Sequence, residues 1–381
     1  MTTSGDDLST LRTMRDVFDY CQRKGLYSVA QGMIELPPPR ALREIVAADV
    51  LKDEAPSSDI HQYRSRMGER DYLNALRTLL KDHYATDVPE GSILATSGVT
   101  GAIVAALMVL RKQGKSRMAV IEPYYTYHSR QVEEVFQKLP EGIPSHLDWS
   151  PDFDAIEKAL KGGVEGIIIA NPNNPTGRVW AKEELQKLVA LTKQYGASLI
   201  LDEIYCDMVF AGNKHYSPIQ DSLEEHVFVC RGYSKTLGAQ SWRLGYAVSH
   251  PETIKSLMTH HDPIYISLAQ YLNKQYSDYV KHINEINALL QTNYEILAPA
   301  FKDALGWEPI APQGSMYGMF KHTEASDIEA LQKGLRAGVG VAPGSMFYVD
   351  NRANSGYIRI HVGISTEKAK KIAETLRANK Q

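Results

Sequence analysis

The feature of the sequence that most limits its possible folds is a series of short apolar runs that begins at residue 93. The runs cover residues 93–96, 118–123, 166–172, 198–205, 226–230 and 244–249. Runs that are mostly apolar are typical of strands covered on both faces of a parallel sheet. Helical stretches, among them 182–195, separate several of these runs. This alternation predicts a doubly wound α/β fold.

The chain is too long for one average domain, and its C-terminal part has a different character. A length of 381 residues favours one large domain and one smaller domain. A long helical stretch, 268–303, precedes short strands and helices that indicate an α+β unit. We therefore predict a large domain of residues 46–284, and a small domain made of residues 1–45 and 285–381.

Charge and cysteine content narrow the class of partner. A formal net charge of −3 gives no reason to expect nucleic acid or an anionic membrane. Three scattered cysteines are too few for a disulfide framework or a zinc site, so we predict no metal. The N-terminal residues do not form a secretory signal, and no stretch reaches the ~20 apolar residues of a membrane span. We expect a cytoplasmic protein.

Polar and aromatic residues follow the ends of the apolar runs, where ligands bind in an open α/β sheet. The first run leads through SGVTG into an apolar helix, which predicts an anion site at Gly98, Val99 and Thr100. The later ends present an aromatic ring, an amide, a carboxylate, a phenol and an amine: Tyr125, Asn174, Asp202, Tyr205 and Lys235. Each residue alone has a purely structural explanation, but their convergence predicts one site.

Two arginines extend this candidate site. In YSKTLGAQSWRLGY, residues 233–246, Ser234 and Lys235 precede Arg243 by a short run that can surround a compact anion. A guanidinium fork suits phosphate, and a deprotonated amine is a nucleophile. Arg359 lies between Ile358 and Ile360 on a predicted strand, so its side chain points away from their apolar face.

Together these motifs resemble the fold-type I pyridoxal-phosphate enzymes of the class I/II aminotransferase group. The resemblance runs from about Val29 to Gly363 and keeps the order of the family's motifs. Its specific elements are SK followed by seven residues and Arg, NPNNPTG, and D-x-x-Y. The resemblance implies a large domain with a mostly parallel sheet and a smaller α+β domain.

The resemblance also implies a role for each residue around pyridoxal 5′-phosphate. Lys235 would hold the cofactor aldehyde as a Schiff base and then move the substrate α-proton. Asp202 would pair with the pyridine nitrogen, which keeps that nitrogen protonated. Tyr205 and Asn174 would hydrogen-bond the phenolic oxygen, and Tyr125 would stack on the ring.

The phosphate would be held by a group of hydroxyls, amides and one guanidinium: Ser234, Arg243, Gly98, Val99, Thr100, and Tyr63 from the neighbouring subunit. Because Tyr63 would cross to a partner, the resemblance implies a homodimer with shared active sites. Arg359 would clamp the substrate α-carboxylate, assisted by Asn174 and the backbone of Gly32. Two positions depart from the family pattern: Gly232, where many members have Ser or Thr, and Ile34, where proline is usual.

The implied activity is transfer of an amino group from an L-amino acid to a 2-oxo acid by a ping-pong mechanism. Nearby tyrosines and methionines favour aromatic or long neutral amino donors: Tyr63, Tyr124, Tyr127, Tyr265, Met33 and Met316. The alternative is a lyase or cyclising enzyme of amino-acid metabolism, because the same cofactor chemistry serves both. A non-catalytic regulator would need an added DNA-binding segment, which we do not expect, and would not need Lys235.

Overall fold

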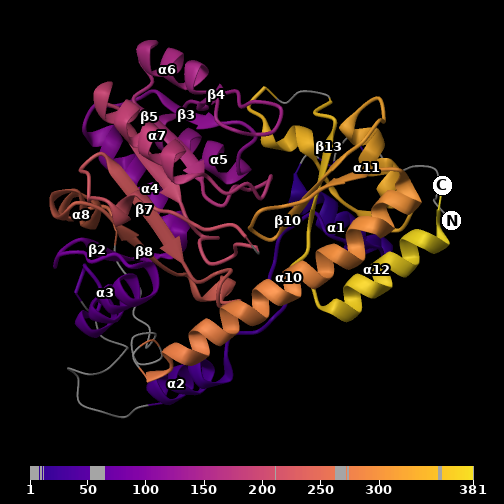
Figure 1. Ribbon diagram of the computed structural model, residues 1–381, viewed down its shortest axis with the longest axis horizontal. Coiled ribbons are helices and arrows are strands. Elements are labelled where there is room, and N and C mark those ends of the chain that lie inside the picture. The colour runs from indigo at the N-terminus through magenta and orange to yellow at the C-terminus, as the bar shows by residue number, and fades with distance from the viewer. Residues whose placement is uncertain are drawn as a thin grey trace.

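The computed structural model describes residues 8, 11, 13–51, 65–210, 212–261, 272, 274–350 and 354–380. Two sheets with their helices lie side by side, and one long helix runs between them (Figure 1). Tyr63 and Tyr265 of the sequence analysis lie outside the described residues. None of the helices in the described part of the chain has the length and apolar character needed to cross a bilayer.

The large sheet confirms the predicted mostly parallel arrangement. Its strand order is β2-β8-β7-β6-β5-β3-β4. The strands are β2 (Ile93–Ser97), β3 (Met118–Ile121), β4 (Glu141–Ile143), β5 (Gly166–Ala170), β6 (Ser198–Asp202), β7 (Val227–Gly232) and β8 (Leu244–Val248). Strand β4 was not among the predicted runs. Strand β8 is antiparallel to both neighbours. Residues 233–243 join it to β7 without a crossover α-helix, which a parallel pairing of the two strands would need.

Helices cover both faces of this sheet: α3 (Arg70–Tyr84), α4 (Gly98–Lys112), α5 (Thr126–Phe136), α6 (Phe153–Lys161), α7 (Lys182–Gln194) and α8 (Pro251–Met258). Successive strand residues enter different cores. Ile168 packs in the core that contains α4, whereas Ile167 and Ile169 pack in the core that contains α6 and α7. All three are at most 4% exposed, and each such side chain contributes about 1.5–3 kcal/mol. The continuous apolar runs therefore reflect burial on both faces.

The smaller sheet is antiparallel, with the order β12-β13-β10-β9. Its strands are β9 (Glu308–Ile310), β10 (Tyr317–Lys321), β12 (Ala342–Pro343) and β13 (Tyr357–His361), and β1 (Tyr27–Ser28) pairs with β11 (Val339–Gly340) beside it. Three helices surround these strands: α1 (Met14–Lys24), α11 (Asp327–Arg336) and α12 (Thr366–Ala378). Helix α1 begins where Thr13 and Asp16 form a reciprocal capping box.

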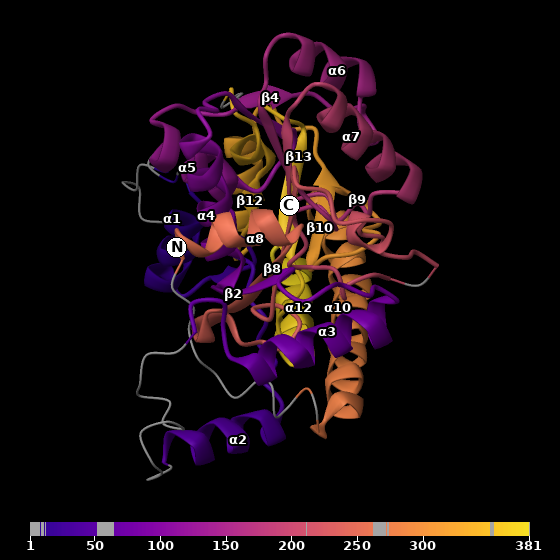
Figure 2. The ribbon, with the colours of Figure 1, turned by 90° about the vertical axis from the view of Figure 1, so that its left-hand side faces the viewer.

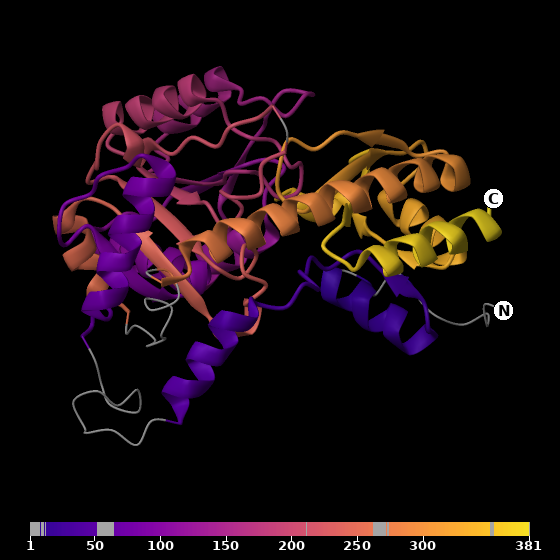
Figure 3. The same ribbon diagram turned by 60° about the horizontal axis from the view of Figure 1, so that its bottom comes forward.

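Helix α10 (Tyr276–Leu305) connects the two parts and packs against α12 (Figures 1 and 3). It ends at Gly306, whose left-handed conformation is the usual stop for a helix. The predicted division between residues 284 and 285 falls inside this helix. Helix α2 (Arg40–Val50) projects beyond the large sheet at one end of the molecule (Figure 2). Three short segments are 3-10 helices: η2 (Pro218–Gln220), η3 (Gln240–Trp242) and η4 (Gly344–Phe347).

Candidate active site

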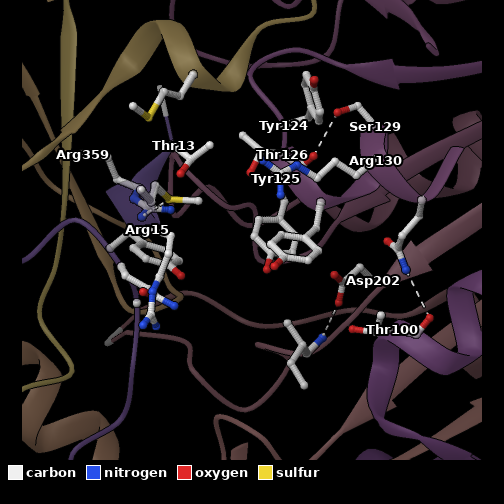
Figure 4. Close-up of a pocket in the computed structure, with 18 of the residues that line it drawn as sticks. Thr13, Arg15, Thr100, Tyr124, Tyr125, Thr126, Ser129, Arg130, Asp202 and Arg359 are labelled. Atoms are coloured by element: carbon white, nitrogen blue, oxygen red, sulfur yellow. Dashed lines mark hydrogen bonds between the residues drawn. The ribbon is translucent and has the colours of Figure 1, made fainter. Parts of the chain in front are cut away.

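A cavity of about 1030 Å³ lies beyond the carboxyl ends of the large sheet, with walls from both sheets and from the segment that begins α1 (Figure 4). Most predicted site residues line it: Gly32, Val99, Thr100, Tyr125, Asp202, Tyr205, Ser234, Lys235, Arg243 and Arg359. Gly98 and Asn174 lie directly behind this lining, against Arg243 and Arg359 respectively. The position of Tyr63 lies outside the described residues.

Lys235 lies in the loop between β7 and β8, and its amine donates to the backbone oxygen of Gly32 over 3.1 Å. Burial lowers the pKa of this amine, and the positive charges of Arg359 and Arg243 lower it further, although Tyr317 and Asp202 act in the opposite sense. A lowered pKa favours the neutral, nucleophilic form of a lysine.

Asp202 ends β6 and is only 4% exposed. Its Oδ1 accepts from the amide of Ile204 over 3.1 Å, and its Oδ2 lies 3.1 Å from Nε2 of His128. His128 was not among the predicted residues. The signal that could have found it is its position one helical turn after Tyr125, where residues three apart lie on the same face.

Tyr125 provides an aromatic plane between the two charged sides of the cavity. In Figure 4, Arg359 and Asp202 appear on opposite sides of its ring. The ring stacks on Tyr127 at 5.6 Å and 21°, and it meets His128 edge-on at 5.4 Å. Burial, followed by the neighbouring groups Tyr317 and Asp202, raises the pKa of Tyr125 far above its ordinary value, so its hydroxyl stays neutral.

Arg359 is a fully buried cation on β13. Its guanidinium donates to Oδ1 of Asn174 over 2.9 Å and to the backbone oxygen of Ala30. Its Cζ lies 4.0 Å from the ring centre of Tyr317 and 4.8 Å from the ring centre of Phe347. No carboxylate of the described residues pairs with it, and burial lowers its pKa. A buried charge without a counter-ion is expensive, so this arrangement is suited to an incoming carboxylate.

Asn174 has an unsatisfied hydrogen-bond donor. Its Oδ1 is occupied by Arg359, but its buried Nδ2 has no hydrogen-bond partner among the described residues. Buried amide donors are nearly always paired, so an orphaned donor at the edge of a cavity indicates that a ligand acceptor belongs there. Arg359 thus fixes the orientation in which Asn174 offers this N–H.

The N-terminus of α4 and Arg243 form a cradle for an anion. Gly98 begins the helix with φ +68°, and a Cβ at this position would lie 2.8 Å from Nη2 of Arg243. Glycine is therefore needed both for the backbone and for the approach of the guanidinium. His261, which was not predicted, accepts from the amide of Ser97 over 2.9 Å. Free first-turn amides and a guanidinium together suit a phosphate group.

Tyr317 on β10 is a third residue, after His128 and His261, that the sequence did not predict. It is 3% exposed, and its hydroxyl lies 3.2 Å from that of Tyr205. Gly32 approaches so closely that a Cβ there would overlap the Tyr317 hydroxyl. The only sequence signal for Tyr317 is its place in PQGSMYGMFKH, whose tyrosine the pattern does not distinguish from a core residue.

These groups can accommodate a flat ring that carries a phosphate and an aldehyde. The anion cradle would take the phosphate, and the carboxylate of Asp202 would face a protonated ring nitrogen. The free Nδ2 of Asn174 and the Tyr205 hydroxyl would meet a ring oxygen, and the amine of Lys235 would meet the aldehyde. Arg359 remains for a second, carboxylate-bearing ligand.

Comparison with known proteins gives a family match over most of the chain. A family model described as aminotransferase class I and II matches residues 31–376. Over 372 residues the chain is 24% identical to aromatic-amino-acid aminotransferase 2 of Thermococcus litoralis, with 93% of this chain and 92% of the relative covered.

Two further similar proteins match different shares of this chain. The chain is 27% identical to kynurenine–oxoglutarate transaminase 3 of Bos taurus over 245 residues, which are 61% of this chain and about half (52%) of the bovine protein. Aspartate aminotransferase from Thermus thermophilus with maleate superposes with a TM-score of 0.83 at 20% identity, covering 99% of this chain and all of that one. At this identity the superposition establishes the fold.

Proposed function

Because the chain belongs to the class I and II aminotransferases, which use pyridoxal 5′-phosphate, we propose that it transfers the amino group of an L-amino acid to a 2-oxo acid by a ping-pong mechanism. The observation that carries this proposal is the buried guanidinium of Arg359. It has no carboxylate partner among the described residues and shares a cavity with Lys235 and Asp202. An amino acid supplies both the carboxylate that Arg359 lacks and the amine that reacts beside Lys235.

We assign the cofactor contacts from the polar groups of the cavity that are free to bind a ligand. Lys235 would carry the aldehyde carbon, and Asp202 would hold a proton on the ring nitrogen. Asn174 and Tyr205 would donate to the ring's phenolic oxygen, and Tyr125 would cover the ring. The phosphate would lie in the cradle of Ser234, Arg243 and the amides of Gly98, Val99 and Thr100. When bound, this group supplies a sink for the electron pair that remains on the substrate α-carbon after its proton leaves.

The protein's own residues would then move one proton. Once its amine is free, Lys235 would be the base that takes the proton from the substrate α-carbon and holds it on Nζ beside the cofactor. It must be neutral to do so, and burial favours this state by lowering its pKa. Arg359 would hold the α-carboxylate through two parallel hydrogen bonds, which orients the α-carbon and excludes unproductive rotations. Met14 Sδ lies 2.8 Å from Nη2 of Arg359, so the start of α1 borders the carboxylate site.

We propose amino donors with aromatic or long neutral side chains. Tyr124, Tyr127 and Met33 line the cavity, whereas Met316 is not part of the lining. The Thermococcus litoralis relative is described as an aromatic-amino-acid aminotransferase, and the bovine relative as a kynurenine transaminase. An apolar, aromatic wall lowers the free energy of a bound aromatic side chain by removing its surface from water.

For the acceptor we propose a 2-oxo acid with a second carboxylate. Arg130 of α5 lines the cavity, and its guanidinium lies 5.5 Å from the ring centre of Tyr127. No described carboxylate pairs with it. Arg66 does not line the cavity, and Arg64 lies outside the described residues. Stacking on Tyr127 holds the Arg130 fork at the cavity wall, where it can meet a distal carboxylate.

We further propose a homodimer in which Tyr63 of one subunit reaches the phosphate of the other, and a domain division near residue 284. Both rest on the resemblance of the sequence to the family. Sedimentation analysis of the cofactor-loaded protein would test the dimer. Tyr63→Phe, with Tyr127→Phe as a comparison outside the phosphate cradle, would test whether residue 63 affects cofactor retention.

The activity is tested by half-reactions. Purified protein loaded with cofactor is mixed with single amino acids, and the cofactor's absorbance is followed as it gains the amino group. We expect aromatic donors to react and added 2-oxo acids to reverse the change, while Lys235→Ala does neither. Release of ammonia without any need for an oxo acid would instead favour the lyase alternative. A cofactor spectrum that no amino acid changes would contradict both.

A further inference from the structure

Tyr317 is in contact with three parts of the site at once. Its hydroxyl lies 3.2 Å from the hydroxyl of Tyr205. The centre of its ring lies 4.0 Å from the guanidinium carbon of Arg359. The same hydroxyl borders Gly32, whose backbone oxygen accepts from Lys235 over 3.1 Å. Because Tyr317 is 3% exposed, these contacts are made without competition from solvent.

The direction of the hydrogen bond between the two hydroxyls follows from proton counting. A tyrosine hydroxyl carries one proton. If Tyr205 donates that proton to the phenolic oxygen of the cofactor, it has none left for Tyr317. The proton between the two hydroxyls must then come from Tyr317. A hydroxyl that accepts a hydrogen bond is a stronger donor to its next partner, because the bonds polarise one another.

The ring of Tyr317 has a separate task. Arg359 has no carboxylate partner among the described residues, so its guanidinium is held by aromatic faces, neutral oxygens and the sulfur of Met14. A desolvated guanidinium over an aromatic face is stabilised more strongly than one in water. The ring also restricts the guanidinium to one orientation. Tyr317 therefore joins the group that contacts the substrate carboxylate to the group that contacts the cofactor oxygen.

We propose that Tyr317 is a positioning residue for both contacts: its hydroxyl donates to Tyr205, and its ring holds Arg359 ready for the substrate carboxylate. This inference rests on the proposed function only in placing the cofactor against Tyr205 and a carboxylate against Arg359. The effect of the hydroxyl on Tyr205 and the effect of the ring on Arg359 can be separated by two substitutions. Tyr317→Phe removes the hydroxyl and keeps the ring, whereas Tyr317→Leu removes both.

The hydroxyl is tested by titration. In cofactor-loaded protein, the pKa of the linkage to Lys235 is read from the pH dependence of the cofactor's absorbance. Tyr205→Phe should raise this pKa, because the phenolic oxygen loses a donor that stabilises its negative charge. Tyr317→Phe should raise the pKa of the linkage by a smaller amount, roughly 0.5–1 pH unit. The reason is that Tyr205 becomes a weaker hydrogen-bond donor when it no longer accepts from Tyr317. In the double variant, the Tyr317→Phe change should add nothing to that of Tyr205→Phe.

Tyr294→Phe is the matched control. Like Tyr317→Phe, it removes one tyrosine hydroxyl. Tyr294 is partly buried, and its hydroxyl donates to the backbone oxygen of Ile310 over 2.9 Å. The Tyr294 ring packs against Gly318, the residue after Tyr317, but Tyr294 does not line the cavity. We expect it to lower the melting temperature and leave the titration unchanged. A general packing effect on β10 would shift both variants alike.

The ring is tested by binding a carboxylate that cannot react. Calorimetric titration with 3-phenylpropanoate should show affinity roughly tenfold lower in Tyr317→Leu than in wild type, while Tyr317→Phe stays within about twofold. The inference is overturned if Tyr317→Phe titrates like wild type, if its shift adds to that of Tyr205→Phe, or if Tyr317→Leu binds the carboxylate normally. Neither measurement requires turnover, so absent transamination would contradict the proposed function and leave this test intact.

Discussion

The guanidinium of Arg359 donates to Oδ1 of Asn174 over 2.9 Å, although 185 residues separate the two in the chain. The contact joins a strand of the small sheet to the loop after a strand of the large one. It occupies the oxygen of Asn174 and leaves its buried Nδ2 without a partner among the described residues. Through this bond the carboxylate site and the ring-oxygen site share one side chain, so a change at either should be felt at the other.

Replacing Arg359 should separate function from stability. Arg359→Leu should lower kcat/KM by about 10²–10³-fold, because hydrogen bonds to a charged group contribute about 1.5–3 kcal/mol each. The cofactor-free protein should retain or raise its melting temperature, since an unpaired buried charge is removed. Arg359→Lys should recover little activity because an ammonium cannot form the planar fork. Steady-state kinetics and calorimetry check both, and a strongly destabilised Arg359→Leu would show that the arginine is mainly structural.

Substitutions of Asp202 and His128 should slow the half-reaction to different extents. Asp202→Asn keeps the size of the side chain but loses the charge opposite the ring nitrogen, so the half-reaction should slow by about 10²–10³-fold. His128→Asn should slow it less, because His128 acts only through Oδ2 of Asp202. Rapid-mixing absorbance with a saturating aromatic donor measures both. Equal losses in the two variants would mean that His128 itself contacts the ligand.

Acid should destabilise the protein through His361. Burial, reinforced by Arg359, Lys368 and Lys235, lowers the pKa of His361 to about 3. The unfolded chain binds a proton near pH 6.5 and the folded chain does not, so stability falls as pH drops from about 6.5 toward 3, by up to about 1.4 kcal/mol per pH unit. His361→Gln should remove this loss. Urea unfolding midpoints at pH 7.5 and 5 measure it, and exposed His146→Gln should follow the wild-type curve.

Gly98→Ala should weaken cofactor binding more than folding. The added methyl would lie 2.8 Å from Nη2 of Arg243, and the backbone φ of +68° already disfavours alanine. We expect an increase of at least tenfold in the cofactor dissociation constant and a loss of roughly 1–3 kcal/mol in stability. Fluorescence titration of the cofactor-free protein gives the first, and urea unfolding the second. Gly114→Ala, at a φ of +82° with open space around it, is the control for backbone strain alone.

The sequence by itself determined the parts of this protein that depend on local pattern. Uninterrupted apolar runs such as GIIIA indicate strands that are buried on both faces, because no polar face remains for water. The carboxyl ends of parallel strands share one edge, so the sequence predicts that Asp202 and Asn174 lie near each other. The motif around Lys235 and Arg243 was distinctive enough to indicate the family.

The tertiary structure decided which side chains touch. Tyr317 has ordinary sequence surroundings, and only packing brings it against Tyr205, as packing also brings His128 against Asp202. The full burial of Arg359 depends on the approach of the small sheet to the large one, since strand alternation gives a direction but not a neighbour. The need for glycine at position 32 has the same origin. Such contacts join residues far apart in the chain, and local periodicity carries no information about those distances.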